Sequence, residues 1–266
     1  MSMDSRRGIS VSFPLAVNFP LCMAPMVGLS HICLREVAQS YMPRGAKTIW
    51  PSEMLNSRRI PDENLSKVPE ALHNKDEKFW VPQILGNEER PIALSVKKLE
   101  DYGADGIDIN MGCPVQRALK HNYGVALMGD ADYAAKVVEM TVSNTNLPVS
   151  VKLRAGLEKD PEKLLVFIKK LESAGASWIT LHPRTAEQKR RGKADWSQIK
   201  YIKESLSIPV IGNGDVFNPE VCKQRFDASG VDAIMIARGA IRKPFIFSQM
   251  NDYLKKATYK EYDSIK

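Results

Sequence analysis

Cys113 is the side chain on which the interpretation of this sequence depends, because it follows a short apolar stretch that ends in Asn110-Met111-Gly112-Cys113-Pro114. The β-branched residues before it favour an extended backbone, and Gly112 and Pro114 are typical of the turn after a strand. A thiol with an ordinary pKa of about 8.5 stays mostly protonated at neutral pH, so it can donate a proton as a general acid. One cysteine at such a place indicates little, but strands that end in polar residues recur along almost the whole chain. That recurrence makes Cys113 a candidate for chemistry.

Other predicted strand ends carry a lysine, a histidine and two amides. Lys152 and Arg154 alternate in Val-Lys-Leu-Arg and therefore share one face of a strand. His182 ends the next strand, while Gln83 and Asn110 supply neutral hydrogen-bonding groups. Each has a plainer alternative: Lys152 pairs with a carboxylate at the rim, His182 is structural, and the amides bind loop backbone. The set holds no carboxylate pair and no metal-ligand cluster, which argues against glycosidase and metallohydrolase chemistry and favours a phosphorylated cofactor that carries the chemistry itself.

Two glycine-containing segments follow the last two predicted strands, Gly212-Asn213-Gly214-Asp215 and Ala237-Arg238-Gly239. Glycine lets backbone N–H groups approach an anion closely, and Arg238 can add a charge-assisted hydrogen bond. The plainer interpretation is a pair of tight turns. Because adjacent loops on the seventh and eighth strands of a barrel often bind phosphate, we predict a phosphate site here.

The elements that must position these residues are eight short apolar runs, each about 30 residues from the next, which is the size of a strand–helix–strand unit. Predicted helices lie between them, with Asp130 as a cap, and residues 54–78 are expected to form a long loop with a short helix. This alternation predicts an α/β fold, a (β/α)₈ TIM barrel. An open doubly wound sheet is the weaker alternative, because no G-x-G-x-x-G follows the first strand. The strands are predicted at 21–24, 47–50, 79–84, 106–110, 148–153, 178–181, 209–211 and 233–236, and the helices at 29–41, 91–102, 133–141, 164–174, 196–206, 219–226 and 245–254.

Composition excludes several classes of protein. The 266 residues contain no apolar run of about 18, so no transmembrane helix is expected, and residues 1–19 lack the features of a signal peptide. The four cysteines form no Cys-x-x-Cys pair, and no histidine lies at zinc-ligand spacing, which argues against structural zinc and disulfides and favours a cytoplasmic location. The formal net charge of +7 is compatible with a polyanionic partner without proving one.

Several segments together resemble the tRNA-dihydrouridine synthases, which are flavin enzymes built on a TIM barrel. Asn110-Met111-Gly112-Cys113-Pro114 is similar to the signature of that family, and further segments match it in order and spacing over about residues 19–248. These segments are Ala24-Pro25-Met26, Gln83, Lys152-Leu153-Arg154, His182-Pro183-Arg184-Thr185 with Gln188, Gly212-Asn213-Gly214-Asp215 and Ala237-Arg238-Gly239.

The resemblance implies a role for each matching residue. Cys113 is the expected general acid, which protonates C5 of a uridine in tRNA after a hydride from FMN reaches C6, with NADPH or NADH as the reductant of the FMN. Asn110, Arg154 and Arg184 are expected to contact the target uracil. Residues expected to hold the FMN are Pro25 and Met26 beside the ring, Gln83, Lys152 and His182 at the isoalloxazine, and Asn213, Gly214, Asp215, Ala237, Arg238 and Gly239 at the phosphate.

Basic residues on the same side of the barrel indicate contact with the tRNA backbone. Lys189, Arg190 and Arg191 follow the sixth strand, and Arg117 and Lys120 follow Cys113. Such a run is otherwise an ordinary solvated surface. We also expect the segment 115–128 to close over the substrate, with Gly124 as a pivot.

The predicted organisation is a leader over 1–18, an FMN-binding barrel over 19–248, and the start of a C-terminal helical segment over 249–266. The family carries a helical tRNA-binding domain after its barrel, so the sequence indicates a truncated or reduced form of it. We expect a monomer that binds tRNA, with no metal and no membrane association. The alternatives are a flavin barrel that acts on a free pyrimidine, as dihydroorotate dehydrogenase does, a Schiff-base lyase that uses Lys152, and a non-catalytic RNA-binding barrel.

Overall fold

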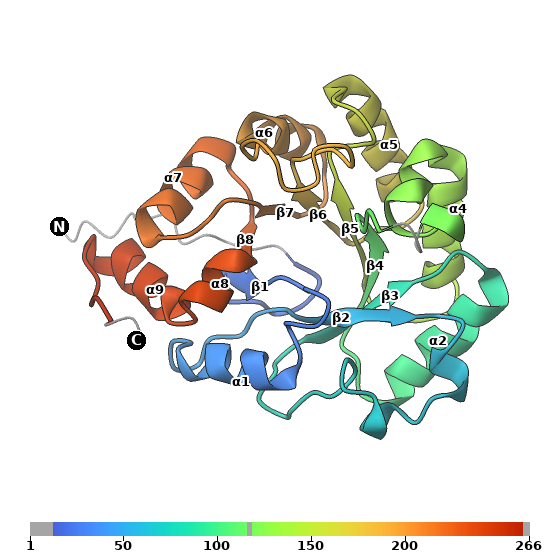
Figure 1. Ribbon diagram of the computed structural model, residues 1–266, viewed down its shortest axis with the longest axis horizontal. Coiled ribbons are helices and arrows are strands. Elements are labelled where there is room, and N and C mark those ends of the chain that lie inside the picture. The colour runs from blue at the N-terminus through green and yellow to red at the C-terminus, as the bar shows by residue number, and fades with distance from the viewer. Residues whose placement is uncertain (1–12, 116–118, 263–266) are drawn as a thin grey trace.

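Eight parallel strands form the centre of the molecule in the computed structural model, which describes residues 13–115 and 119–262 (Figure 1). Their hydrogen-bonded order is β1-β8-β7-β6-β5-β4-β3-β2, so each strand from β2 onward lies beside the next one in the chain. The predicted TIM barrel is confirmed. The strands are β1 (Leu21–Met23), β2 (Trp50–Asn56), β3 (Trp80–Leu85), β4 (Ile107–Met111), β5 (Val149–Arg154), β6 (Trp178–His182), β7 (Val210–Asn213) and β8 (Ala233–Ile236).

The seam between β1 and β2 is closed near the starts of these two strands, by residues of β1 and of the segments that precede both strands. The Thr48 hydroxyl donates to the carbonyl of Leu21 over 2.7 Å, and the backbone N–H groups of Asn18 and Phe19 both donate to the carbonyl of Lys47. These bonds join the first and second strands near their amino ends, so the sheet curls into a barrel.

Helices surround the strands on the outside, as Figure 1 shows. Asp130 forms the predicted side-chain cap, and Asp160 and Asn218 cap two further helices, because each accepts a hydrogen bond from the backbone N–H three residues later. The helices are α1 (Ile32–Ser40), α2 (Glu89–Asp101), α4 (Ala131–Val142), α5 (Pro161–Ser173), α6 (Trp196–Ser205), α7 (Pro219–Ser229), α8 (Arg238–Arg242) and α9 (Ile246–Lys256), with short 3₁₀ helices η1 (Ile60–Asp62), η2 (Leu65–Lys67) and η3 (Gly124–Gly129).

Three elements differ from the sequence-based expectation. Strand β2 lies at Trp50–Asn56, not at 47–50, and its register with β3 shifts between Pro51 and Met54. Residues 54–78 contain the end of β2 and two 3₁₀ helices where one short helix was predicted. Helix α8 was not predicted, because its five residues are too few to show helical periodicity.

The interior of the barrel changes from apolar to polar along its axis. At the amino ends of the strands, Trp178, Val81 and Ile211 belong to one apolar cluster, against which Phe13 packs from the preceding segment. Towards the carboxyl ends, strand positions that line the cavity carry polar groups such as Lys152, Arg154 and His182. The packed end therefore supports the barrel, and the polar end is available for chemistry.

Candidate active site

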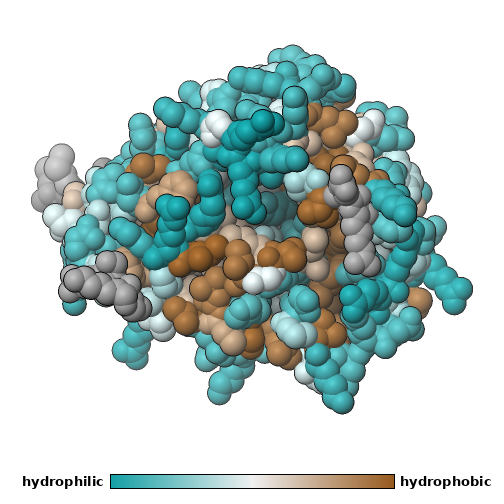
Figure 2. Space-filling model, viewed as in Figure 1, coloured by the Kyte–Doolittle hydropathy of each residue, from teal (hydrophilic) through white to brown (hydrophobic). Residues whose placement is uncertain are grey.

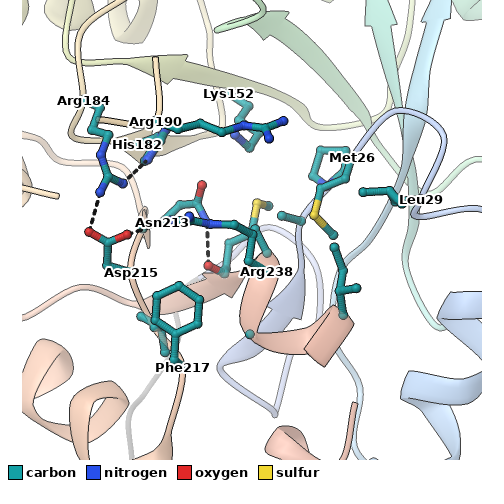
Figure 3. Close-up of a pocket in the computed structure, with 18 of the residues that line it drawn as sticks. Met26, Leu29, Lys152, His182, Arg184, Arg190, Asn213, Asp215, Phe217 and Arg238 are labelled. Carbon is teal, nitrogen blue, oxygen red and sulfur yellow. Dashed lines mark hydrogen bonds and ion pairs between the residues drawn. The ribbon is translucent and has the colours of Figure 1, made fainter. Parts of the chain in front are cut away.

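A cavity of about 340 Å³ opens at the carboxyl ends of the strands, between the loops that follow β1, β5, β6, β7 and β8. Figure 3 shows Asp215, Arg184 and Phe217 on one side of it and Met26 and Leu29 on the other. Most of the predicted cofactor residues line it, together with three of the predicted substrate and rim residues. The predicted residues in the lining are Pro25, Met26, Lys152, Arg154, His182, Arg184, Arg190, Asn213, Gly214, Asp215, Ala237, Arg238 and Gly239.

The loops after β7 and β8 are tied to each other at one end of the cavity. The Asn213 amide donates to the carbonyl of Met235 over 2.7 Å, and Arg238 donates to Asp215 over 2.9 Å. The Asp215 carboxylate also accepts from Arg184 and from the Ala194 N–H. Partial burial acts to raise the pKa of Asp215, but the bonds from Arg184 and Ala194 and the charge of Arg238 lower it overall. Asp215 is therefore an ionised anchor that holds Arg238 at the mouth.

Gly239 allows these two loops to approach so closely. A Cβ atom at this position would lie 2.3 Å from the carbonyl oxygen of Val216, a distance that no real side chain tolerates. The glycine is thus required by packing of backbone against backbone.

Lys152 and His182 come from the adjacent strands β5 and β6, and both line the cavity floor. Burial lowers the pKa of Lys152 to about 8, while the Asp108 carboxylate opposes the shift. Burial also lowers the pKa of His182 to about 2, and the charges of Lys152, Arg154 and Arg184 add to the effect. His182 is therefore neutral. Its Nε2 atom lies 3.3 Å from a guanidinium nitrogen of Arg184. Because a guanidinium can only donate, we assign Nε2 as the acceptor and place the ring proton of His182 on Nδ1.

Cys113 stands on a turn beside this cavity and does not itself line it. The Asn110 side-chain oxygen accepts from the backbone N–H groups of Gly112 and Cys113 over 3.1 and 2.9 Å. Arg154, which does line the cavity, donates from Nε to the carbonyl of Gly112 over 3.0 Å. The half-buried thiol packs against Leu85 and Tyr123. These contacts join the thiol-bearing turn to the cavity through Asn110 and Arg154.

The predicted closing segment meets this turn at Gly124. Gly124 has a φ of +56°, and a Cβ atom there would lie 2.7 Å from the carbonyl oxygen of Cys113. The N–H of Val125 donates to the same oxygen over 3.1 Å. A glycine is therefore needed for the chain to return across Cys113, whereas closure over a substrate stays a prediction, because residues 116–118 of the segment lie outside the described residues.

Gln83 on β3 and Asn110 on the neighbouring strand β4 face each other. Asn110 pairs in register with Lys152, and its amide donates to the Gln83 oxygen over 2.7 Å. Gln83 is almost fully buried and in turn donates to Asp108. Both predicted amides are thus close to the cavity, and their contacts with cofactor and uracil stay predictions.

Two buried carboxylates belong to this region without having been assigned a role from the sequence. Glu53 in the middle of β2 accepts a 2.5 Å hydrogen bond from the N–H of Gly28, which holds the loop after β1. Asp108 lies on β4 two residues before Asn110 and shares its inward face. The alternation of Asp108 with Asn110 was the available signal, since residues two apart on a strand point the same way.

Arg154 and Arg184 hold the basic loop after β6 from inside. Arg154 donates to the carbonyls of Thr185 and Lys189, and Arg184 donates to those of Arg191 and Gly192. With its guanidinium engaged in this way and paired to Asp215, Arg184 supports the loop, and its predicted contact with uracil stays a prediction.

The predicted basic rim lies partly around this mouth. The side chains of Lys189, Arg190 and Arg191 are exposed, and none has an ion pair with a described carboxylate. Lys120 is exposed as well, and Arg117 lies outside the described residues. Figure 2 shows hydrophilic side chains along the upper edge of a central hollow and hydrophobic ones below it. The mouth therefore has one cationic edge and one apolar edge.

Two absences concern residues 13–115 and 119–262, which the structure describes. Among these residues, no group of three or more histidine, cysteine, aspartate or glutamate side chains is arranged to bind a metal ion. None of the helices found there combines the length and the apolar character needed to cross a bilayer.

Comparison with known proteins agrees with this geometry. The family model described as dihydrouridine synthase (Dus) matches residues 22–266. A probable tRNA-dihydrouridine synthase of Rickettsia conorii is 38% identical over 246 residues, which cover 92% of this chain and 73% of that protein. A tRNA-dihydrouridine synthase B of Pasteurella multocida is 32% identical over 234 residues, covering 88% and 69%.

Similar solved structures support the fold. A 2-naphthoyl-CoA reductase in complex with 2-naphthoyl-CoA superposes with a TM-score of 0.67 at 11% identity, over 89% of this chain and 50% of that one. Histamine dehydrogenase from Rhizobium sp. 4-9 superposes with a TM-score of 0.68 at 13% identity, over 92% and 48%. At such low identity these matches concern architecture alone. On the strength of the family match and the curated relatives, the chain belongs to the dihydrouridine synthase family.

Proposed function

We propose that this protein is an FMN-dependent tRNA-dihydrouridine synthase that reduces the C5–C6 double bond of a uridine in tRNA, with NADPH or NADH as reductant and Cys113 as proton donor. The observation that carries the proposal is the thiol of Cys113 on a turn that Asn110 and Arg154 tie to a cavity with a cationic end. The names of the curated relatives supply the tRNA substrate.

The lining residues fit a flavin mononucleotide. Arg238, anchored by Asp215, and the closely approaching backbone at Gly239 suit a phosphate, because both offer donors without a free carboxylate. Lys152 and the neutral His182 suit the polar edge of the ring, and Pro25 and Met26 offer an apolar wall. When bound, the flavin supplies the hydride that is added to C6 of the uracil.

The residues of the chain then complete the reduction. Asn110 and Arg154 orient the uracil beside Cys113. As C6 gains hydrogen, the electron pair of the double bond moves to C5, and Cys113 donates its proton there while its sulfur keeps the bonding electrons. The thiolate recovers a proton from solvent. A uridine within tRNA must leave its stack to reach this mouth, as with other enzymes that act on bases.

The visible absorption spectrum of the purified protein tests the proposal most directly. We expect flavin bands that bleach on anaerobic addition of NADPH and return on addition of tRNA that lacks dihydrouridine, together with dihydrouridine in the recovered tRNA by mass spectrometry. Return of the bands with a free pyrimidine in place of tRNA would favour the dihydroorotate-type alternative. A colourless protein that borohydride traps with a carbonyl substrate would favour the lyase.

Raising the pH through about 8 is expected to weaken FMN binding. The pKa of Lys152 is depressed to about 8 in the folded protein, so its ammonium is present below that pH and lost above it. The FMN phosphate does not cause the change, because the second pKa of a phosphate ester is about 6 and its charge is constant from pH 7 to 9. FMN affinity measured by fluorescence quenching from pH 7 to 9 should fall, and Lys152→Gln should flatten the dependence. An equally steep fall in the variant would contradict this role of Lys152.

Gly239→Ala is expected to weaken FMN binding by about tenfold or more, because the added methyl group pushes the loops after β7 and β8 apart. Fluorescence titration with FMN measures the effect. Gly129→Ala is the matched control, since a Cβ atom there meets only Leu157 at an ordinary 3.7 Å. If both variants bind FMN equally well, the proposed phosphate end is wrong.

Neutralising the loop after β6 is expected to weaken tRNA binding and to reduce its salt dependence. The exposed cations Lys189, Arg190 and Arg191, which have no ion pair with a carboxylate of the described residues, are replaced by glutamine. The slope of log affinity against log salt should then fall by roughly 0.9 for each phosphate group that the loop no longer neutralises. A control triple variant at Lys97, Lys136 and Lys223, which are exposed helix residues already paired with carboxylates, should keep the slope. Equal slopes in the two variants would show that the loop is ordinary surface.

A further inference from the structure

Asp108 on β4 is a buried carboxylate to which the proposed mechanism gives no task. It accepts from the Gln83 amide over 2.6 Å and from the Ser150 hydroxyl over 2.6 Å, and only 3% of it is exposed. From Gln83 the hydrogen bonds continue to Asn110 over 2.7 Å and then to the backbone N–H groups of Gly112 and Cys113. A continuous chain of hydrogen bonds thus connects Asp108 to the turn that carries the thiol.

The direction of this chain follows from the chemistry of its first member. An ionised carboxylate can only accept, so Gln83 must present its NH₂ group to Asp108 and its oxygen to Asn110. Asn110 must then present its NH₂ group to Gln83, which turns its oxygen towards the two backbone N–H groups. With Gln83 reversed, its NH₂ group would face the NH₂ group of Asn110, and with Asn110 reversed as well, the turn would lose both hydrogen bonds.

We infer that Asp108 is a positioning residue for Cys113, because it sets the orientation of the Gln83 and Asn110 amides and thereby holds the backbone of the Gly112–Cys113 turn. The inference rests on the proposed function only for the role of Cys113 as an acid. The hydrogen-bond relay itself, defined as Asp108, Gln83 and Asn110, concerns the folded chain.

The surroundings of Asp108 agree with an ionised acceptor at neutral pH. Burial raises its pKa to about 6, while the bonds from Gln83 and Ser150 and the charge of Lys152 limit the shift. Cys22 on β1 also faces Asp108, and burial raises the pKa of that thiol to about 12, so it stays uncharged. At pH 7 to 8 the carboxylate is therefore charged and can only accept hydrogen bonds.

Amide hydrogen exchange of the Gly112–Cys113 turn in the full chain tests the relay. Asp108→Ala removes the acceptor, and Gln83→Met breaks the relay while keeping the side chain of Asp108. In both variants we expect exchange at these two amides to accelerate by about fivefold or more, as for loss of a stabilising hydrogen bond, with exchange in β6 and β7 unchanged. Gln83→Met keeps the test valid if Asp108→Ala fails to fold.

A double variant restores the relay with the negative charge at residue 83 in place of residue 108. In Gln83→Glu with Asp108→Asn, the new carboxylate accepts from both neighbours and again turns the oxygen of Asn110 towards the turn. Exchange is expected to return to within about twofold of the wild-type rate. Ser150→Ala is the matched control, because it removes a hydrogen bond to Asp108 outside the relay, and it should leave the turn unchanged.

The outcomes separate the inference from its alternatives. If Asp108→Ala accelerates exchange and Gln83→Met does not, the carboxylate acts through Lys152 and the relay is wrong. Failure of the double variant to slow the exchange, or acceleration spread over the whole barrel, would equally overturn it. Turnover of tRNA is measured alongside: a wild-type protein without turnover refutes the proposed function, whereas the exchange rates still decide on the relay.

Discussion

Cys113→Ala is expected to slow the reduction of uridine in tRNA by about 10²- to 10⁴-fold, which is the range for loss of a positioned general acid. The proton for C5 would then have to come from water instead of from a thiol on the Asn110-anchored turn. Reduction of the flavin by NADPH should proceed at the wild-type rate, because that step needs no proton from this thiol. The variant therefore separates the two halves of the reaction.

Single-turnover kinetics with pre-reduced protein and tRNA measure this effect. Cys33→Ala is the matched control, because Cys33 is an exposed thiol on α1, while Cys22 and Cys222 are buried. Cys113→Ser is expected to react nearly as slowly as the alanine variant, since a hydroxyl is a far weaker acid than a thiol. Turnover of tRNA by Cys113→Ala at the wild-type rate would remove Cys113 from the mechanism.

The barrel could be predicted from the sequence because its signal is repeated. Each strand is a run of apolar or β-branched residues, and the units follow one another at a nearly constant spacing, so an error in one strand does not alter the fold. Strand β2 shows such an error: its Pro51 and Glu53 obscure the strand, and its register shift has no marker in the sequence. Helix α8 was missed because five residues cannot display a helical period.

The sequence could predict which residues would meet at one cavity, whereas the hydrogen bonds among them could not be predicted. That Lys152 and His182 share one cavity floor follows from parallel strands ending at the same edge. The hydrogen bond from Arg184 to Asp215 and the one from Gln83 to Asp108 depend on side-chain rotamers and on the distances between strands. Neither quantity can be read from the sequence. A buried acidic residue within a strand is also easily taken for an exposed position, because carboxylates are rarely buried.

Arg35 and Glu77 form a fully buried ion pair that was not recognised from the sequence either. Arg35 on α1 donates from Nε to Glu77 over 2.5 Å, and neither side chain is exposed. The same guanidinium donates to the carbonyl of Ser30 over 2.8 Å, and the Ser30 hydroxyl accepts from the N–H of Met26 over 2.7 Å. The ion pair therefore holds α1, the segment before β3 and the cavity-lining loop after β1 together.

Glu77→Gln is expected to lower the free energy of unfolding by about 3–5 kcal/mol, because it leaves the guanidinium of Arg35 buried without a counter-charge. For a chain of this size the midpoint of thermal unfolding should fall by roughly 10 °C, measured by circular dichroism. Glu88→Gln is the control: its pair with Arg58 is exposed, so its loss should cost less than about 1 kcal/mol. Replacing both partners, as Arg35→Met with Glu77→Leu, should recover much of the loss, since no buried charge then remains. Equal midpoints for Glu77→Gln and Glu88→Gln would mean that water or another group reaches Arg35, contrary to its complete burial.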